Sequence, residues 1–230
     1  MMRRCKRVAL LAAFILAGGM ASLVPAQNKS VLTTVHNLSS SGPGEVRALG
    51  ESEVCKFCHI PHNPVLAKPL WGQALSRAQY LTPSVQAGAG AKIPAPQPDG
   101  SSRLCLSCHD GTVALGDVRG RARPIPFAGG QRLRPGQRGF IGTDLTGSHP
   151  ISFTVPATDP NPGAGEKDMG LRSVQMVASD DDVTLDAAGK MQCTTCHDPH
   201  SDQYYQPGKV PRFWVKPTVQ EVCITCHELR

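Results

Sequence analysis

The longest continuous apolar stretch of the chain runs from Val8 to Val24. Four basic residues precede this stretch, and Val24-Pro25-Ala26 supplies small residues just ahead of Gln27. A basic start, an apolar segment and a small-residue site in this order are typical of a secretory signal peptide, so residues 1–26 are expected to be removed on export. The alternative is an uncleaved membrane anchor, but about 17 weakly apolar residues are marginal for spanning a bilayer.

Beyond residue 26, hydrophobic and polar positions follow no sustained period. The segments 83–100 and 119–139 show neither the period of two typical of strands nor the period of 3.6 typical of helices. The chain contains 23 glycines and 20 prolines, and aromatic residues make up only 5%. A chain of this kind needs covalent links or cofactors to stay folded. The pattern predicts a mostly irregular, coil-rich fold with little β structure.

The cysteines follow one repeated motif. Of the nine cysteines, Cys5 lies in the expected signal peptide, and the other eight form four Cys-x-x-Cys-His sequences. Two thiols at this spacing can add to the two vinyl groups on one porphyrin edge, and the next residue then brings its imidazole to the iron, so the motif predicts covalent haem c. Four disulfides, zinc knuckles and thioredoxin-like pairs are alternatives, but none of them requires a histidine after every second cysteine. The predicted thioether ligands are Cys55, Cys58, Cys105, Cys108, Cys193, Cys196, Cys223 and Cys226, and the predicted proximal iron ligands are His59, His109, His197 and His227.

The histidine count indicates what the irons can do. The chain has eight histidines, so four remain after the proximal ligands: His36, His62, His149 and His200. Four irons each need a sixth ligand, and four histidines remain. We therefore expect two histidines on the iron of each of four haem c groups. Such irons keep no open position for a substrate, so we expect an electron carrier rather than an enzyme, with lower potentials than a His/Met pair would give. Short helices are expected at the haem motifs, with the haems supplying the core.

The motifs recur in two halves. Residues 58–63 match residues 196–201 in the pattern Cys-His-x-Pro-His, and residues 104–110 match residues 222–228. Each half contains a lone histidine, then a Cys-x-x-Cys-His-x-Pro-His motif, then a Cys-x-x-Cys-His motif followed by an acidic residue. The repeat predicts a first dihaem unit at 27–125 and a second at 126–230, joined as one continuous haem-wrapped domain.

The spacing of the histidines suggests how they pair. His62 lies three residues after His59, and three residues span at most ~10 Å, too little to pass around the porphyrin edge. His62 is therefore expected to serve haem 2 at His109. By the same reasoning His200 is expected to serve haem 4, which leaves His36 and His149 for haems 1 and 3.

The motif order, the Cys-His-x-Pro-His pairs and the segments 36–39 and 147–151 resemble the tetrahaem extracellular filament cytochromes of metal-reducing bacteria. The resemblance implies a stacked haem chain, head-to-tail polymers and an axial histidine that one subunit lends to the next. His36 stands in a Ser- and Gly-rich arm, and it is the residue expected to cross in this way, with ligation of haem 1 in its own chain as the alternative. A monomeric periplasmic tetrahaem carrier and a small multihaem reductase are the alternatives.

Charge limits the partners. After removal of residues 1–26, 20 basic residues face 18 acidic ones, and haem propionates would add negative charge. This balance does not provide the strong basic face that nucleic acid or anionic lipid requires. The expected partners are other redox proteins or copies of this chain. The expected location is outside the cytoplasmic membrane, in the periplasm or at the cell surface, with no integral membrane segment once the signal is cleaved.

Overall fold

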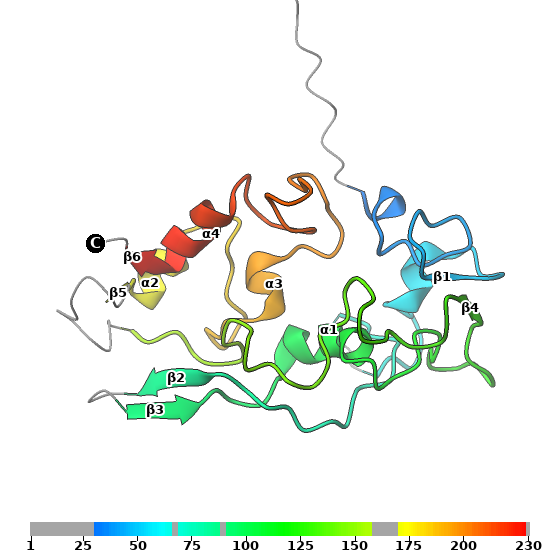
Figure 1. Cartoon of the computed structure of the whole chain (residues 1–230), viewed down its shortest axis with the longest axis horizontal. Coiled ribbons are helices and arrows are strands. Elements are labelled where there is room, and N and C mark those ends of the chain that lie inside the picture. Colours follow the sequence, from blue (N-terminus) through cyan, green and yellow to red (C-terminus); the bar gives the residue numbers. More distant parts are fainter. Residues whose placement is uncertain (1–29, 66–68, 88–90, 158–169, 229–230) are drawn as a thin grey trace, which may run out of the picture.

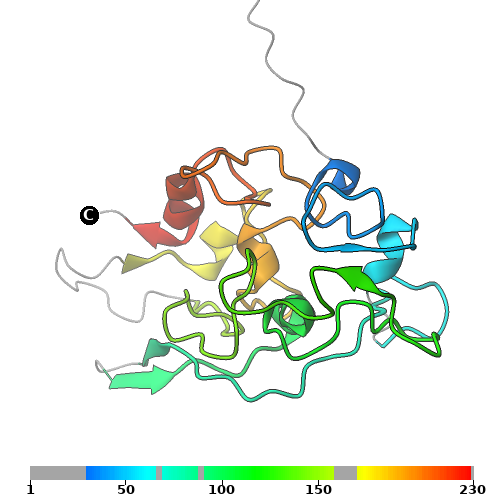
Figure 2. The ribbon, with the colours of Figure 1, turned by 45° about the vertical axis from the view of Figure 1, so that its right-hand side comes forward.

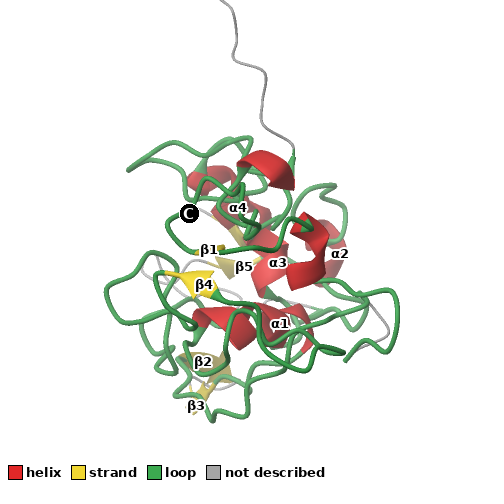
Figure 3. Cartoon of the chain, turned by 90° about the vertical axis from the view of Figure 1, so that its right-hand side faces the viewer, coloured by secondary structure: helices red, strands yellow, loops and turns green. Residues whose placement is uncertain are grey.

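The computed structural model describes residues 30–65, 69–87, 91–157 and 170–228, and the predicted signal peptide lies outside the described residues. Loops and turns connect short elements over most of this part of the chain (Figure 3). The helical elements are η1 (Val31–Thr33), η2 (Val54–Phe57), α1 (Gly100–His109), α2 (Val174–Val177), α3 (Cys193–Cys196) and α4 (Val219–Cys226). The prediction of a mostly irregular fold with short helices at the cysteine motifs is confirmed, because η2, α1, α3 and α4 coincide with the four motifs.

The β structure is limited to antiparallel pairs of short strands. The described strands are β1 (Arg47–Ala48), β2 (Ser84–Ala87), β3 (Ala91–Pro94), β4 (Phe127–Ala128), β5 (Gly170–Leu171) and β6 (His227–Glu228). They pair as β1 with β4, β2 with β3 and β5 with β6. Figures 1 and 2 both place the β2–β3 hairpin at the lower edge of the molecule, away from α4 and from the β1–β4 pair.

The motif helices begin at defined caps. The Thr218 hydroxyl accepts a hydrogen bond from the backbone N–H of Glu221 and so caps α4. Gln192 and Thr195 form a capping box at the start of α3. Both helices end at the second cysteine of their motif, and the next residues, His197 and His227, adopt extended backbone. Each of these two proximal histidines therefore leaves its helix directly.

Two hydrophobic clusters lie against the cysteine motifs. Cys58 and Cys108 pack on the first cluster, which has a buried core of Ala48, Phe57, Ile60, Leu115, Val118, Ile125, Phe127 and Leu133. Cys196 and Cys226 pack on another, whose buried core is Val155, Val177 and Met191. Each of these clusters thus packs against cysteines of two motifs. The boundary at residue 126 stays a prediction, and Phe127 and Leu133 pack with the first cluster.

A buried polar junction joins the two halves where α1 packs against α3. Gln192 lies at the centre of this junction and is only 1% exposed. Its side-chain oxygen accepts hydrogen bonds from the hydroxyls of Ser102 (2.6 Å) and Ser152 (3.2 Å). Its amide nitrogen donates to Asp99 and Asp186, at 2.9 Å each. Every hydrogen-bonding atom of this amide is engaged, so the junction holds the helices of motifs 2 and 3 in a fixed relation.

Candidate functional site

The four motifs follow one another across the long axis of the molecule, with α1 and α3 at the centre and α4 towards one end (Figure 1). Successive motifs are neighbours through their cysteines. Motifs 1 and 2 meet through Cys58 and Cys108, which pack on one cluster. Motifs 3 and 4 meet in the same way through Cys196 and Cys226.

The two pairs of motifs meet at Cys105 and Cys193, where the neighbouring Cys193 thiol is the main cause that raises the pKa of Cys105. Nearby, the hydroxyls of Ser101 and Thr194 are 2.6 Å apart, and the backbone N–H of Cys193 donates to the Ser102 hydroxyl at 3.0 Å. The thiols therefore form an uninterrupted series in the order 1, 2, 3, 4. Porphyrins attached at these thiols would have neighbouring edges.

Most of the thiols are neutral in their surroundings. Burial raises the pKa of Cys58 and of Cys196 to about 12, and it raises the pKa of Cys108 to about 11. A thiol with such a pKa behaves as a small apolar group. All eight motif cysteines are free of disulfides. These three buried thiols thus offer an apolar lining of the kind that a porphyrin edge requires.

Three proximal histidines are oriented by backbone carbonyls. Nδ1 of His59 lies 2.7 Å from the Pro69 oxygen, Nδ1 of His109 lies 2.6 Å from the Gly139 oxygen, and Nδ1 of His197 lies 3.0 Å from the Arg212 oxygen. A carbonyl can only accept, so each Nδ1 carries the proton and each Nε2 keeps its lone pair. This is the usual second-shell arrangement of a metal-bound imidazole.

Three of the predicted distal ligands, His36, His149 and His200, use Nδ1 in the same way. His36 donates to the Pro199 oxygen at 3.1 Å, and His149 donates to the Pro150 oxygen at 2.8 Å. Nδ1 of His200 lies 3.1 Å from Oδ1 of Asp198. Burial, with a contribution from nearby His109, lowers the pKa of His36 to about 4. The neutral imidazole that iron ligation needs is therefore the stable form of His36 at neutral pH.

Three pairs of histidine rings stand at the separation that one iron would require. A metal–nitrogen bond is about 2.0 Å long and a ring nitrogen lies roughly 1.1 Å from the imidazole centre, so two axial imidazoles have centroids about 6 Å apart. The measured centroid separations are 6.1 Å for His59 and His200, 6.0 Å for His36 and His109, and 6.2 Å for His149 and His227. The residues fit haem iron on this geometric test.

These pairs differ from those expected from the sequence. The ring beside His200 is that of His59 rather than His227, the ring beside His36 is that of His109 rather than His59, and the ring beside His149 is that of His227 rather than His197. The sequence-based pairing assumed that each Cys-His-x-Pro-His histidine serves the next motif of its own half. The sequence-based pairing stays a prediction, but the segment 197–200 crosses to the first half, where Pro199 and His200 contact His36 and His59.

The expectation that His36 ligates a haem of a neighbouring copy stays a prediction. The arm that carries His36 is held within its own chain, because the His36 ring stacks on Phe213 with centroids 4.1 Å apart and hydrogen-bonds to Pro199. Asn37 is buried and donates to the Leu32 oxygen at 2.7 Å, which folds the arm on itself. Local hydrogen bonds thus order a segment whose composition suggested a free extension.

His62 and His197 remain without a histidine partner among the described residues, which include all eight histidines. His62 is exposed, and the ring neighbour of His197 is Trp214, at a centroid distance of 5.0 Å. The structure therefore brings six of the eight predicted ligands together in pairs and leaves one distal and one proximal ligand apart.

A structural repeat that the sequence reading missed surrounds His59 and His197. Each of these histidines forms an isolated antiparallel bridge with a tryptophan, Trp71 and Trp214 respectively. The residue before each tryptophan has a left-handed backbone, with φ of 64° at Leu70 and 63° at Phe213. The sequence carries a signal for this repeat. After each Cys-x-x-Cys-His-x-Pro-His motif comes a triplet in which an apolar residue precedes tryptophan.

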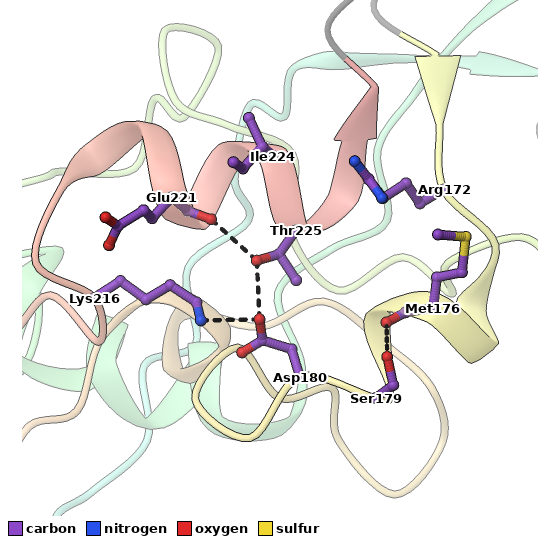
Figure 4. Close-up of a pocket in the computed structure, with 8 residues that line it drawn as sticks. All are labelled: Arg172, Met176, Ser179, Asp180, Lys216, Glu221, Ile224 and Thr225. Carbon is purple, nitrogen blue, oxygen red and sulfur yellow. Dashed lines mark hydrogen bonds and ion pairs between the residues drawn. The ribbon is translucent and has the colours of Figure 1, made fainter.

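A surface pocket of about 400 Å³ lies on the outer side of α4 (Figure 4). Asp180 accepts hydrogen bonds there from Lys216 at 2.9 Å and from the Thr225 hydroxyl at 3.2 Å. Arg172 reaches from β5 towards α4 on the other side of this pocket (Figure 4). Because Thr225 lies between the two cysteines of motif 4, these contacts fix that motif to the turn at Asp180.

Comparison with known proteins identifies one family signature. The family profile described as a doubled CXXCH motif matches residues 186–229, which contain motifs 3 and 4. A comparison with curated proteins finds no match. The doubled motif indicates covalently bound haem c and a multihaem c-type cytochrome, with electron transfer as its function. Among the described residues, no helix has the length and apolar character needed to cross a lipid bilayer.

Proposed function

We propose that this chain carries four haem c groups and passes electrons along them in the order of the motifs, without substrate chemistry at the irons. The observation that carries the proposal is the set of three histidine pairs at 6.0–6.2 Å, each containing one motif histidine. A bound haem would supply the one-electron Fe(III)/Fe(II) couple. The protein's part is to hold neutral imidazoles on both sides of the iron and to keep neighbouring porphyrin edges close.

The alignment of thiols supports transfer along the chain. The contact between Cys105 and Cys193 joins the two halves, and the clusters beneath motifs 1–2 and 3–4 join the motifs within each half. A continuous series of this kind gives an electron a path between the ends of the molecule. Bis-histidine ligation would also keep the iron potentials low.

We further propose that copies of this chain polymerise as an exported filament, with His62 of one copy ligating haem 3 of the next. Two observations support this proposal. His62 is exposed, and His197 is the one motif histidine that lacks a histidine ring at about 6 Å among the described residues. Each chain would thus donate one ligand and accept one, and such a head-to-tail contact generates a filament when its rotation does not close into a ring.

The test is His62→Ala in the full holoprotein, with Asn63→Ala as the matched control next to it. We expect His62→Ala to keep four haems by mass, to lose polymers in electron micrographs and to gain one high-spin ferric haem in its electron paramagnetic resonance (EPR) spectrum. Asn63→Ala should behave as wild type. Polymers formed by His62→Ala with unchanged low-spin spectra would overturn the ligand assignment.

The two alternatives predict different results for wild-type protein. A monomeric carrier would keep four low-spin haems and one-chain particles at every concentration. A small multihaem reductase would show a high-spin haem at every concentration, which nitrogen or sulfur oxyanions would perturb. The filament predicts a high-spin signal that appears on dilution and disappears on assembly. Export to the periplasm or cell surface is tested by fractionation of cells that express the full chain.

A further inference from the structure

Two segments far apart in the sequence hold His59 and His197 in the same way. The backbone N–H of the residue after each histidine donates to the residue before the tryptophan, from Ile60 to Leu70 at 2.9 Å and from Asp198 to Phe213 at 2.8 Å. The residue after each tryptophan donates to the second cysteine of the motif, from Gly72 to Cys58 at 2.8 Å and from Val215 to Cys196 at 3.1 Å. We call these segments, 69–71 and 212–214, the tryptophan clamps.

Each tryptophan clamp contains a left-handed residue that is not glycine. Leu70 and Phe213 have φ of 64° and 63°, a conformation that is unfavourable for a bulky residue. A strain of this kind persists only where the surroundings determine it, and it is found at functional positions. The same strain at equivalent positions of both clamps argues that the backbone direction itself is needed there.

The left-handed residue controls the acceptor of the histidine proton. A peptide unit is planar, so φ of Leu70 sets the orientation of the Pro69 carbonyl, and φ of Phe213 sets that of the Arg212 carbonyl. These two carbonyls are the acceptors for Nδ1 of His59 and His197. Rotating φ by about 180° to the ordinary extended region would turn each carbonyl away from its imidazole.

We infer that Leu70 and Phe213 are positioning residues that aim a backbone carbonyl at the proximal histidines of haems 1 and 3 and thereby set the reduction potentials of those two haems. The inference rests on the proposed haem ligation. A hydrogen bond from Nδ1 increases the basicity of the imidazole, which stabilises ferric iron and lowers the potential. Phe213 has a second role, because its ring also stacks on His36, the partner of His109.

The experiment compares substitutions that tolerate a left-handed backbone with substitutions that do not. Leu70→Gly and Leu70→Asn keep positive φ accessible, whereas β-branched Leu70→Val opposes it. The Leu70 side chain is 43% exposed, so little packing is lost in any of the three variants. Phe213→Gly and Phe213→Ile form a second pair in which both variants lose the ring stacked on His36, so their difference isolates the backbone.

The readouts are haem content by mass and a redox titration followed through the low-spin ferric EPR signals. We expect Leu70→Val to shift one haem about tenfold towards ferrous iron, which is 59 mV for a one-electron couple, while Leu70→Gly and Leu70→Asn stay near wild type. Phe213→Ile should shift a different haem relative to Phe213→Gly.

Two outcomes separate the inference from the function on which it rests. If Leu70→Val, Leu70→Gly and Leu70→Asn all bind four haems and each haem has the same potential in all three variants, the positioning role is overturned and haem ligation stands. Fewer than four haems in wild-type protein would overturn the proposed function itself. If Leu70→Val does not fold, the Phe213 pair still tests the inference. Equal haem potentials in Phe213→Ile and Phe213→Gly would overturn it.

Discussion

The imidazoles of His59 and His200 lie nearly parallel, with centroids 6.1 Å apart and planes inclined by 18°. The two residues belong to different halves of the chain, so the distal ligand of the first haem would come from the second repeat. His36 adds a second link between the halves, because it faces His109 while it hydrogen-bonds to Pro199. The contacts of His36 and His200 therefore interlock the two repeats.

The first prediction concerns the contact between His59 and His200. His200→Ala should leave the iron of haem 1 with an open sixth position, because no other histidine ring contacts His59 at about 6 Å in the described part of the chain. We expect one high-spin haem in the EPR spectrum, with four haems still attached. The high-spin signal should disappear when His200→Ala is combined with Cys55→Ala and Cys58→Ala, which remove haem 1.

The control for this prediction is His149→Ala in the same background without haem 1. Because His149 faces His227, its high-spin signal should persist there. A signal from His200→Ala that survives the loss of haem 1 would instead assign His200 to haem 4, as the sequence spacing alone suggested.

The second prediction concerns haem attachment at motif 1. Replacing both Cys55 and Cys58 by alanine should reduce the mass by one haem and leave three haems, because each motif binds its porphyrin through its own two thioethers. Intact-protein mass spectrometry and haem staining of denaturing gels measure this directly. Cys5→Ala lies in the expected signal peptide and should leave the haem count at four. An unchanged count in the Cys55/Cys58 variant would contradict the attachment.

The third prediction is a pH dependence that arises at Asp180. Burial alone would raise the pKa of this carboxyl, but hydrogen bonds from the N–H groups of Val183 and Asp182 and from Lys216 outweigh burial and lower the pKa to about 2. The folded-state pKa lies below that of the unfolded chain, about 3.9. The ionised carboxylate therefore stabilises the fold above about pH 4, and this contribution is lost as the pH falls through the folded-state value.

Thermal unfolding of the holoprotein measures this contribution. Asp180→Asn should lower the melting temperature at neutral pH, and the difference from wild type should shrink between about pH 4 and pH 2. Asp181→Asn is the matched control, because Asp181 is the exposed neighbour in the same turn. A difference that stays constant down to pH 2 would show that the ionised form of Asp180 does not contribute.

The sequence predicted the chemistry of the site better than its spatial arrangement. Cys-x-x-Cys-His motifs are local, because thioether and proximal ligation need only five adjacent residues, and their helices follow from the same short segments. The distal partners depend on long-range folding. His200 reaches His59 because the segment 197–200 crosses between the halves, and no local pattern predicts that crossing.

The positions of the supporting residues were also hidden for a physical reason. The acceptors of the histidine protons are backbone carbonyls of Pro69, Gly139 and Arg212, and a carbonyl is present at every residue. Only the backbone angle selects which one faces the ring. Leu70 and Phe213 carry no sequence mark of a left-handed conformation, so the repeated triplet that ends in tryptophan does not reveal which carbonyl faces the ring.

The last prediction concerns the junction between α1 and α3. Gln192→Leu keeps the approximate volume of the side chain but leaves the buried hydroxyls of Ser102 and Ser152 without their acceptor. Leaving a buried polar group unsatisfied costs roughly 1–3 kcal/mol, so we expect the free energy of unfolding of the holoprotein to fall by about that amount. Gln192→Glu retains an acceptor but places a third carboxylate beside Asp99 and Asp186, and it should destabilise more at neutral pH than at pH 4. Gln206→Leu is the surface control and should change stability by less than about 0.5 kcal/mol.

Because the junction holds motif 2 against motif 3, Gln192→Leu should also weaken the magnetic coupling between those haems in EPR, while Gln206→Leu should not. Unfolding and coupling equal to wild type in Gln192→Leu would mean that other contacts between α1 and α3 suffice to hold the two halves together.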